Sequence, residues 1–280
     1  PSTAASAGGT LGRPALAPHA MLLDRLPALA RTRVILASAS PRRADLLRQA
    51  GLASFDVRPS SFAEDLPKVW GHGNGEECRR SGRRLRGATD ARPPFSPPLQ
   101  ARGRGAAYAA ATAAAKATDV AAAVVAEMER DAAWPGGGSL DALLISADTV
   151  VEAPTGAILE KPADDADAVA MLTSLSGASH AVHTGVCLVA LRRGAPTTTR
   201  SFCVSTAVTF APLTPAAIAA YVATGEPTGK AGAYGVQGAA ACFVSSIDGC
   251  YFNVVGLPLH RLAVEVGSML DDGLVGVRAA

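Results

Sequence analysis

The sequence predicts a mixed α/β fold. Short apolar runs of strand length alternate along the chain with segments that carry helix caps and helical spacing. Two turns, at 154–156 and 192–194, join neighbouring strands into hairpins, so part of the sheet is expected to be antiparallel. The chain has 280 residues and 49% hydrophobic composition, which suffices for a buried core in one large domain or two small ones.

The first predicted unit is a strand followed by a turn and a helix. The apolar run 34–37 has the length of a buried strand, and Pro41 suits the first turn of the helix that follows. The hydroxyl of Ser38 lies in the turn. Arg42 and Arg43 are unfavourable beside the positive end of a helix dipole unless an anion binds there. The unit therefore predicts a phosphate site, and a solvent-exposed arginine pair is the alternative.

The central part of the chain predicts two more strands, a hairpin and a long helix. A partly alternating run at 55–62 predicts a strand, and an alanine-rich run at 107–130 predicts one helix. The apolar run 143–147 predicts a second buried strand that ends at Asp148, and 149–159 predicts a hairpin. An ionised aspartate at the end of a buried strand needs a partner or a metal.

The C-terminal part continues the alternation of helices and strands. The expected elements are a helix at 166–175, strands at 182–191 and 201–210, a helix from 215 to 223, strands at 242–247 and 251–255, and a final helix after Pro258. Residues 225–238 are rich in glycine, which excludes a helix and allows the backbone to approach a ligand closely.

Two segments are expected to lie outside the folded domain. Residues 1–30 are rich in alanine, proline and serine with one acidic residue, which is typical of a disordered leader or an organelle transit peptide. Residues 69–105 show no helical or strand period and indicate a low-complexity insertion in a single domain that spans 31–270. This segment carries eight arginines and three acidic residues, so it holds the basic excess of the chain. A dispensable insertion or a gene-model artefact is favoured over an RNA-binding arm.

The cysteine pattern and the hydropathy indicate the cellular location expected for the protein. Five cysteines are scattered without a paired spacing, which argues against a disulfide framework and gives no support for a zinc site. A cytoplasmic protein is expected, or an organellar one if residues 1–30 are a transit peptide. No run of about 18 apolar residues lacks breakers, so no membrane span is expected.

Charged side chains lie where the predicted elements end. They are Arg42, Arg43, Glu64, Asp148 and Lys161. Carboxylates can hold Mg²⁺ together with water and substrate oxygens, while arginine and lysine can bind phosphate oxygens. The set therefore predicts metal-assisted attack on a phosphoanhydride. Each residue alone would equally suit an ordinary surface charge or helix cap, and a lone helical lysine such as Lys116 is usually a solvated surface residue.

Several motifs resemble the signature of the Maf family of nucleoside triphosphate pyrophosphatases. They include Ser38-Ala-Ser-Pro-Arg-Arg43, Ser146-Ala-Asp-Thr-Val-Val151, Ile158-Leu-Glu-Lys-Pro162 and Lys230-Ala-Gly-Ala-Tyr-Gly-Val-Gln-Gly238. The resemblance covers residues 33–68 and 106–267 in the family's order. The motifs look like the dTTP/UTP branch, and they are similar to the Maf-like half of acetylserotonin methyltransferase-like proteins.

The resemblance implies a fold, an activity and a set of site residues. The fold would be an α/β sheet bent around a central cleft between two lobes, usually in a homodimer. The activity would be hydrolysis of dTTP, UTP and related or modified nucleotides to the monophosphate and pyrophosphate with Mg²⁺ or Mn²⁺, a house-cleaning role. By matching position, Ser38, Arg42, Arg43, Thr149 and Gln237 would bind substrate, Glu64 and Asp148 would hold the metal, Asp148 would also be the base, and Lys116 and Lys161 would stabilise phosphate charge.

The chain departs from the family pattern at three places. Gly229 stands where an aspartate commonly precedes the Lys-Ala-Gly stretch, and Ser205 replaces an acidic residue before Thr206. Residues 69–105 replace a shorter connection between Glu64 and the helix of Lys116. A nucleotide-binding regulator without turnover is therefore the alternative, and RNA binding through the arginine cluster is a third hypothesis. Neither a membrane nor a nucleic-acid partner is expected.

Overall fold

The computed structural model describes residues 22–29, 32–62, 103–130, 141–193 and 195–276 of the 280-residue chain. Glu64 and the expected insertion up to residue 102 lie outside these residues.

The described residues form one open, seven-stranded mixed sheet. Its strands are β1 (Arg33–Leu36), β2 (Asp56–Val57), β3 (Asp141–Glu152), β4 (Ile158–Leu159), β5 (Ser179–Arg192), β6 (Thr198–Phe210) and β7 (Val244–Asp248). The order is β2-β1-β3-β5-β6-β7, and β4 pairs with the end of β3. β1 is parallel to β2 and β3, while the other neighbours are antiparallel. The mixed α/β prediction is confirmed.

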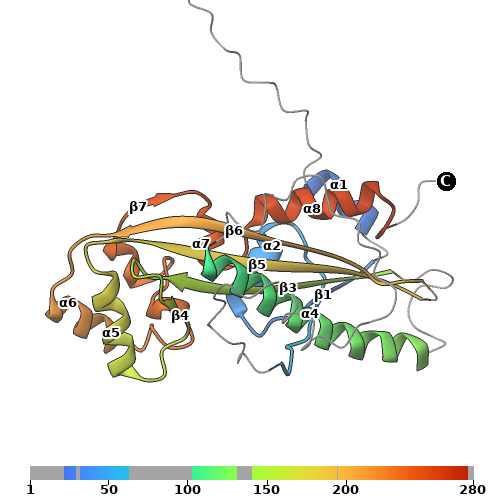
Figure 1. Ribbon diagram of the computed structural model, residues 1–280. Coiled ribbons are helices and arrows are strands. Elements are labelled where there is room, and N and C mark those ends of the chain that lie inside the picture. The colour runs from blue at the N-terminus through green and yellow to red at the C-terminus, as the bar shows by residue number, and fades with distance from the viewer. Residues whose placement is uncertain (1–21, 30–31, 63–102, 131–140, 194, 277–280) are drawn as a thin grey trace, which may run out of the picture.

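Helices cover both faces of this sheet. They are α1 (Leu22–Leu29), α2 (Pro41–Gln49), α4 (Arg104–Arg130), α5 (Asp165–Leu175), α6 (Pro215–Val222), α7 (Tyr251–Val255) and α8 (Leu259–Asp271), with short 3₁₀ turns at η2 (Ala231–Ala233) and η3 (Ala239–Phe243). Figure 1 shows α1 and α8 on one face, α4 on the opposite face, and α5 and α6 at the end of the sheet near β4. Separate hydrophobic clusters lie beneath α1, α2 and α8, beneath α4, and beneath α5 and α6.

Helix α4 approaches the sheet unusually closely at Gly185. A Cβ atom at this glycine would lie only 2.3 Å from the backbone oxygen of Ala109. In the β3–β5 register Gly185 pairs with Asp148, so both residues face α4. Two turns after Ala109, α4 carries Lys116. The missing side chain at Gly185 therefore brings a lysine of α4 within reach of Asp148.

Helix α4 also has the length and composition of a membrane span, unlike any other helix in the described part of the chain. The sequence had not indicated such a segment. Its buried residues pack against β3 and β5, and Lys116 is among them. Core helices commonly pass the same test of length and hydropathy, so this feature alone is weak evidence for a membrane segment.

Several predicted elements are confirmed with shifted bounds. The 149–159 hairpin, the helix at 166–175, the paired strands around 192–194, the helix from Pro215 and the final helix are all present. The long helix begins at Arg104, inside the range expected as insertion. The strand expected at 55–62 is only the two residues of β2, and the strand expected at 242–247 starts at Val244, after η3.

Three expectations are wrong. Residues 251–255 form helix α7 instead of a strand, because buried Asn253 donates to the carbonyl oxygen of Val182 and to Thr206. Residues 22–29 of the expected disordered leader form α1, whose Leu22 and Leu29 are buried in the cluster that includes α8. Asp148 does not end a strand but lies within the twelve-residue β3.

Candidate active site

A pocket of about 750 Å³ opens along one edge of β3. On that edge β3 pairs with β1 as far as Ile145 and with β4 from Val151 onward. Among the described strands, the intervening stretch has a neighbour only on the β5 side. The size suits a small-molecule ligand. The pocket is lined by residues from all three large hydrophobic clusters, in agreement with the expected cleft between two lobes.

The chemistry on one side of β3 centres on a buried ion pair. Lys116 Nζ donates to Asp148 Oδ1 over 2.7 Å, and the two residues are only 8% and 7% exposed. A buried carboxylate is stable in its charged form only with a partner of this kind. Both residues line the pocket. The alternative interpretation of Lys116 as a solvated surface lysine is therefore wrong.

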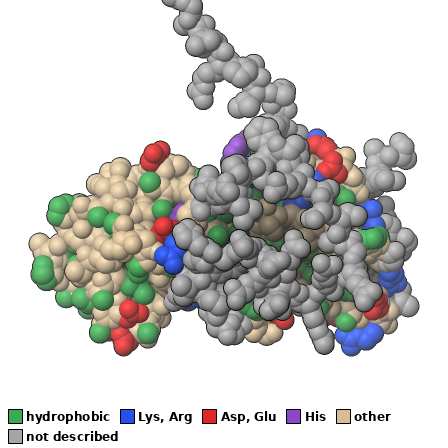
Figure 2. Space-filling view, in the orientation of Figure 1, with side chains coloured by type: hydrophobic (Ala, Val, Ile, Leu, Met, Phe, Trp, Pro, Cys, Tyr) green, Lys and Arg blue, Asp and Glu red, His purple; other side chains and the backbone are tan. Residues whose placement is uncertain are grey.

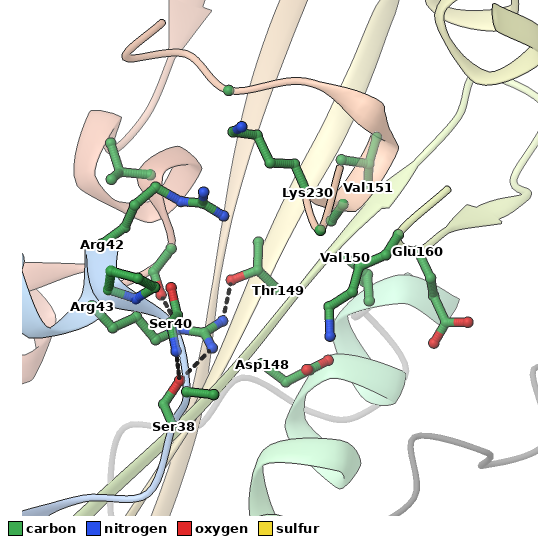
Figure 3. A pocket seen from close by; sticks show the side chains of 18 of the residues that line it. Ser38, Ser40, Arg42, Arg43, Asp148, Thr149, Val150, Val151, Glu160 and Lys230 are labelled. Atoms are coloured by element: carbon green, nitrogen blue, oxygen red, sulfur yellow. Dashed lines mark hydrogen bonds between the residues drawn. The ribbon is translucent and has the colours of Figure 1, made fainter. Parts of the chain in front are cut away.

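The opposite side of β3 is fixed by Arg43. Its Nε donates to the carbonyl oxygen of Gly256 over 2.9 Å, Nη1 to Ser38 Oγ over 3.0 Å, and Nη2 to Thr149 Oγ1 over 2.9 Å (Figure 3). These contacts join α2, the turn after β1, β3 and the end of α7. We call Ser38, Arg43, Thr149 and Gly256 the strand wall of the pocket.

The hydroxyl of Thr149 is already used by protein groups. Thr184 Oγ1 donates to the carbonyl oxygen of Asn253 over 2.9 Å, so in the 3.0 Å contact between Thr149 and Thr184 the proton comes from Thr149. The same Thr149 oxygen accepts from Arg43. This arrangement fixes the orientation of Thr149 in the strand wall.

Residues 225–238 form the other side of the pocket, which we call the loop wall. Glu226 holds this wall together, since its carboxylate accepts from Tyr221 Oη over 3.0 Å and from the backbone N–H of Ala239 over 2.9 Å. Lys230 Nζ donates to the backbone oxygen of Glu226. A Cβ at Gly235 would lie 2.7 Å from Lys230 Cε, so the lysine stem lies directly over this glycine.

Arg42 and Lys230 converge on one space between the two walls. Figure 3 shows the guanidinium of Arg42 and the ammonium of Lys230 extending toward each other. The Arg42 side chain makes no hydrogen bond or ion pair with any residue in the described part of the chain. Burial lowers the pKa of Lys230, and the positive charge of Arg42 lowers it further, while Glu226 acts in the opposite direction.

A buried histidine supports the loop wall from beneath. His180 Nε2 lies 2.9 Å from the hydroxyl of Tyr234, which lines the pocket, and the His180 ring packs edge-on against Phe210 and Tyr234. Burial lowers the pKa of His180 to about 4. The imidazole is therefore neutral near pH 7, and it fixes Tyr234 without adding charge beside the pocket.

The pocket brings together nearly all the residues that the sequence indicates. Ser38, Arg42, Arg43, Lys116, Asp148, Thr149, Lys161 and Gln237 all line it. Lys161 and Gln237 are exposed at its surface, and Glu64 lies outside the described residues. The roles of these residues remain predictions.

Three further charged residues line the pocket without having been predicted. They are Glu160, Glu226 and Lys230. Lys230 is the only basic residue of the 225–238 stretch, so its position in the sequence could have indicated it. Glu160 precedes Lys161 directly, and its carboxylate accepts from Tyr108 Oη over 2.7 Å. Its place in the pocket depends on the β3–β4 hairpin, which the sequence alone does not position.

The donor set fits a divalent metal that is shared with a substrate. Within the described ranges no three histidine, cysteine, aspartate or glutamate side chains form a ready metal cluster. Mg²⁺ bound with a polyphosphate needs only one or two carboxylates, because water and phosphate oxygens complete its shell. Asp148 and Glu160 are carboxylates on the pocket lining. The chemistry of these residues is compatible with such an ion.

Known proteins of one family are similar to this chain. A family model described as "Maf-like protein" matches residues 33–269. A dTTP/UTP pyrophosphatase from Moorella thermoacetica is 42% identical over 231 residues, which are 82% of this chain and 92% of the relative. Proteins of the same name from Koribacter versatilis and Geobacter metallireducens are 38% and 40% identical over 82% and 85% of this chain, and over 90% and 96% of their own lengths.

Proposed function

The chain belongs to the Maf-like protein family, and on that premise we propose that it hydrolyses dTTP and UTP to the nucleoside monophosphate and pyrophosphate. The observation that carries the proposal is the buried Asp148–Lys116 pair, which faces a pocket rich in basic side chains. A carboxylate in such surroundings stays ionised and can accept a proton, while the cations attract the triphosphate.

The predicted site residues have separate tasks in this reaction. Asp148 takes a proton from the attacking water, and Lys116 holds the Asp148 carboxylate in place over 2.7 Å. Lys116 and Lys161 stabilise the negative charge that develops on the phosphates. Ser38, Arg42, Arg43, Thr149 and Gln237 bind or orient the substrate. Mg²⁺ or Mn²⁺, held by Asp148 with Glu160 or Glu64, would withdraw charge from the phosphate oxygens.

The test is the identity of the products. The purified chain is incubated with dTTP, UTP, CTP and GTP and with Mg²⁺ or Mn²⁺, and nucleotides and phosphates are separated by chromatography. We expect dTMP or UMP and pyrophosphate in equal amounts. Release of orthophosphate with a nucleoside diphosphate, or no turnover of dTTP and UTP, would contradict the proposal. An Asp148→Asn preparation controls for contaminating phosphatases.

A nucleotide-binding regulator without turnover is the second candidate. It is favoured by the change at Gly229, which lines the pocket at φ +70° with open space around it. Binding of dTTP without product formation in the same assay would support it. The other departure, Ser205, is accommodated, because its hydroxyl lies 2.7 Å from His183 Nδ1.

RNA binding has less support. Most of the arginine-rich segment 69–105 that suggested it lies outside the described residues. Figure 2 shows acidic and basic side chains interspersed on the described part of this face, without a continuous basic patch. A homodimer and a cytoplasmic location complete the proposal. Light scattering of the purified chain and fractionation of cells test these two points.

A further inference from the structure

Arg42 and Arg43 are consecutive on α2 but are used differently. All three nitrogens of the Arg43 guanidinium donate to protein oxygens at 2.9–3.0 Å. Arg42 is half-buried and makes no hydrogen bond or ion pair with the described residues, although it points into the pocket. A half-buried guanidinium without an anionic partner is unfavourable in the unliganded protein.

Lys230 makes the position of the Arg42 guanidinium more unfavourable. It approaches the same space from the loop wall, and its ammonium is held there by the backbone oxygen of Glu226. Gly235 provides the room for its stem, since a Cβ there would lie 2.7 Å from Cε. Two cations that share a space repel each other, and the lowered pKa of Lys230 reflects burial first and Arg42 second. An anion with two or more negative charges, bound between Arg42 and Lys230, would turn this repulsion into net attraction.

The position of this cation pair relative to Asp148 selects which phosphates it binds. Pyrophosphate is the leaving group when the water oxygen attacks the α-phosphorus, and in that reaction the α-phosphate lies near Asp148 and Lys116. In Figure 3 Arg42 and Lys230 lie on the other side of Thr149 from Asp148. The phosphates that extend away from the point of attack are the β- and γ-phosphates.

We propose that Arg42 and Lys230 form the subsite for the pyrophosphate leaving group, and that Arg43 is a positioning residue that holds the strand wall. This inference rests on the proposed pyrophosphatase function. As the bond between the α-phosphorus and the bridging oxygen breaks, its electron pair passes to that oxygen. The water proton goes to Asp148, and the two cations stabilise the additional charge on the departing pyrophosphate.

The first test is product inhibition by inorganic pyrophosphate and by dTMP. In a Lys230→Met variant we expect the inhibition constant for pyrophosphate to rise about 10- to 100-fold, which corresponds to loss of one charged hydrogen bond. The constant for dTMP should stay unchanged, because dTMP lacks the terminal phosphates. Lys230→Arg should restore most of the pyrophosphate affinity. Equal weakening of both inhibitors would overturn the subsite and show that Lys230 only supports the fold of the loop.

The second test does not require turnover. Calorimetry measures binding of pyrophosphate, with Mg²⁺ present, to the wild type, to Lys230→Met and to Arg42→Gln. Arg48→Gln is the matched control, because Arg48 is an exposed arginine of the same helix that pairs with Asp45. Pyrophosphate binding that depends on Arg42 and Lys230 in a chain that hydrolyses nothing would support the subsite and reject the proposed activity. Binding that is equal in all four proteins would overturn the subsite alone.

Discussion

The strand wall and the loop wall enclose one pocket, but they differ in how their polar groups are satisfied. In the strand wall Arg43, Ser38 and Thr149 bind one another and Gly256. In the loop wall each carboxylate oxygen of Glu226 accepts a hydrogen bond, whereas the ammonium of Lys230 faces the guanidinium of Arg42. The polar groups of the strand wall are therefore satisfied without a ligand, whereas the charges of Arg42 and Lys230 between the walls are not.

The two groups of residues therefore have different tasks. The strand wall fixes the positions of the surrounding elements, and Arg42 and Lys230 bind the ligand. Hydrogen bonds within the strand wall hold β1, α2, β3 and α7 in fixed relation, and such buried networks are costly to interrupt. Cations that meet without an anion destabilise the empty pocket slightly and gain most when a polyphosphate arrives. Substitutions in the first group should reduce stability and activity together, and those in the second should reduce activity alone.

The largest effect is expected at Asp148, where the chemistry is proposed to take place. Asp148→Asn keeps the shape and one acceptor for Lys116 but removes the base and the negative charge. We expect kcat for dTTP to fall about 10³-fold, within the usual range for a general base. Initial rates measure it, and thermal melting checks that the variant is folded. A variant that retains more than a tenth of wild-type kcat would remove Asp148 from the mechanism.

The next effect compares the two consecutive arginines directly. Arg43→Gln loses three hydrogen bonds and leaves buried acceptors unpaired, so the free energy of unfolding should fall by roughly 2–4 kcal/mol. Arg42→Gln removes a cation that has no protein partner in the described part of the chain, so the change should stay within about 0.5 kcal/mol. Urea unfolding of both variants decides the matter. Similar losses in the two variants would mean that Arg43 does not stabilise the strand wall more than Arg42 stabilises its surroundings.

The same pair shows what sequence reasoning could and could not predict. Position after a strand and at the start of a helix indicated an anion site for both arginines, and both line the pocket. Neither the anion site nor the exposed-pair alternative included the role that the structure shows for Arg43, whose guanidinium donates to protein oxygens up to 213 residues away. Partners at that distance are set by the packing of α2 against α7, which no local pattern records.

Burial is the second quantity that the sequence could not give. No local pattern separates Lys116 from a surface lysine, although the family resemblance implied a role for it. Its burial depends on the contact of α4 with Gly185. The helix α7 was mistaken for a strand because five residues are too few to show a period. Long, strongly patterned elements such as β5 and β6 were predicted correctly, since their turn and hydrophobic runs agree.

A third prediction concerns the support beneath the loop wall. Because burial lowers the pKa of His180 to about 4, the unfolded chain binds the proton first as pH falls. His180 therefore contributes stability that is full above about pH 6.5 and is lost progressively toward pH 4, by up to about 3 kcal/mol. His180→Gln, which can still bind Tyr234, should show a flatter loss of stability over this range.

His183, whose pKa burial also lowers, contributes to the same pH range in both proteins, so the difference between them isolates His180. His260→Gln, at an exposed histidine, is the control and should follow the wild type. Denaturant midpoints at pH 4.5, 5.5 and 7 measure the effect. Parallel curves for the wild type and His180→Gln would mean that His180 is not held in its neutral form.

A smaller loss of stability than that of Arg43→Gln is expected at Glu226, which holds the loop wall together. Its carboxylate accepts from Tyr221 and from the N–H of Ala239, and Glu226→Gln can replace only one of these acceptors well. A loss of about 1–2 kcal/mol is expected, and it should be confined to the loop. Hydrogen exchange should therefore quicken at amides in 225–239 and stay unchanged in β3 and β5. Quickening in β3 as well would mean that the two walls unfold together, and the distinction between a rigid strand wall and a separately held loop wall would not hold.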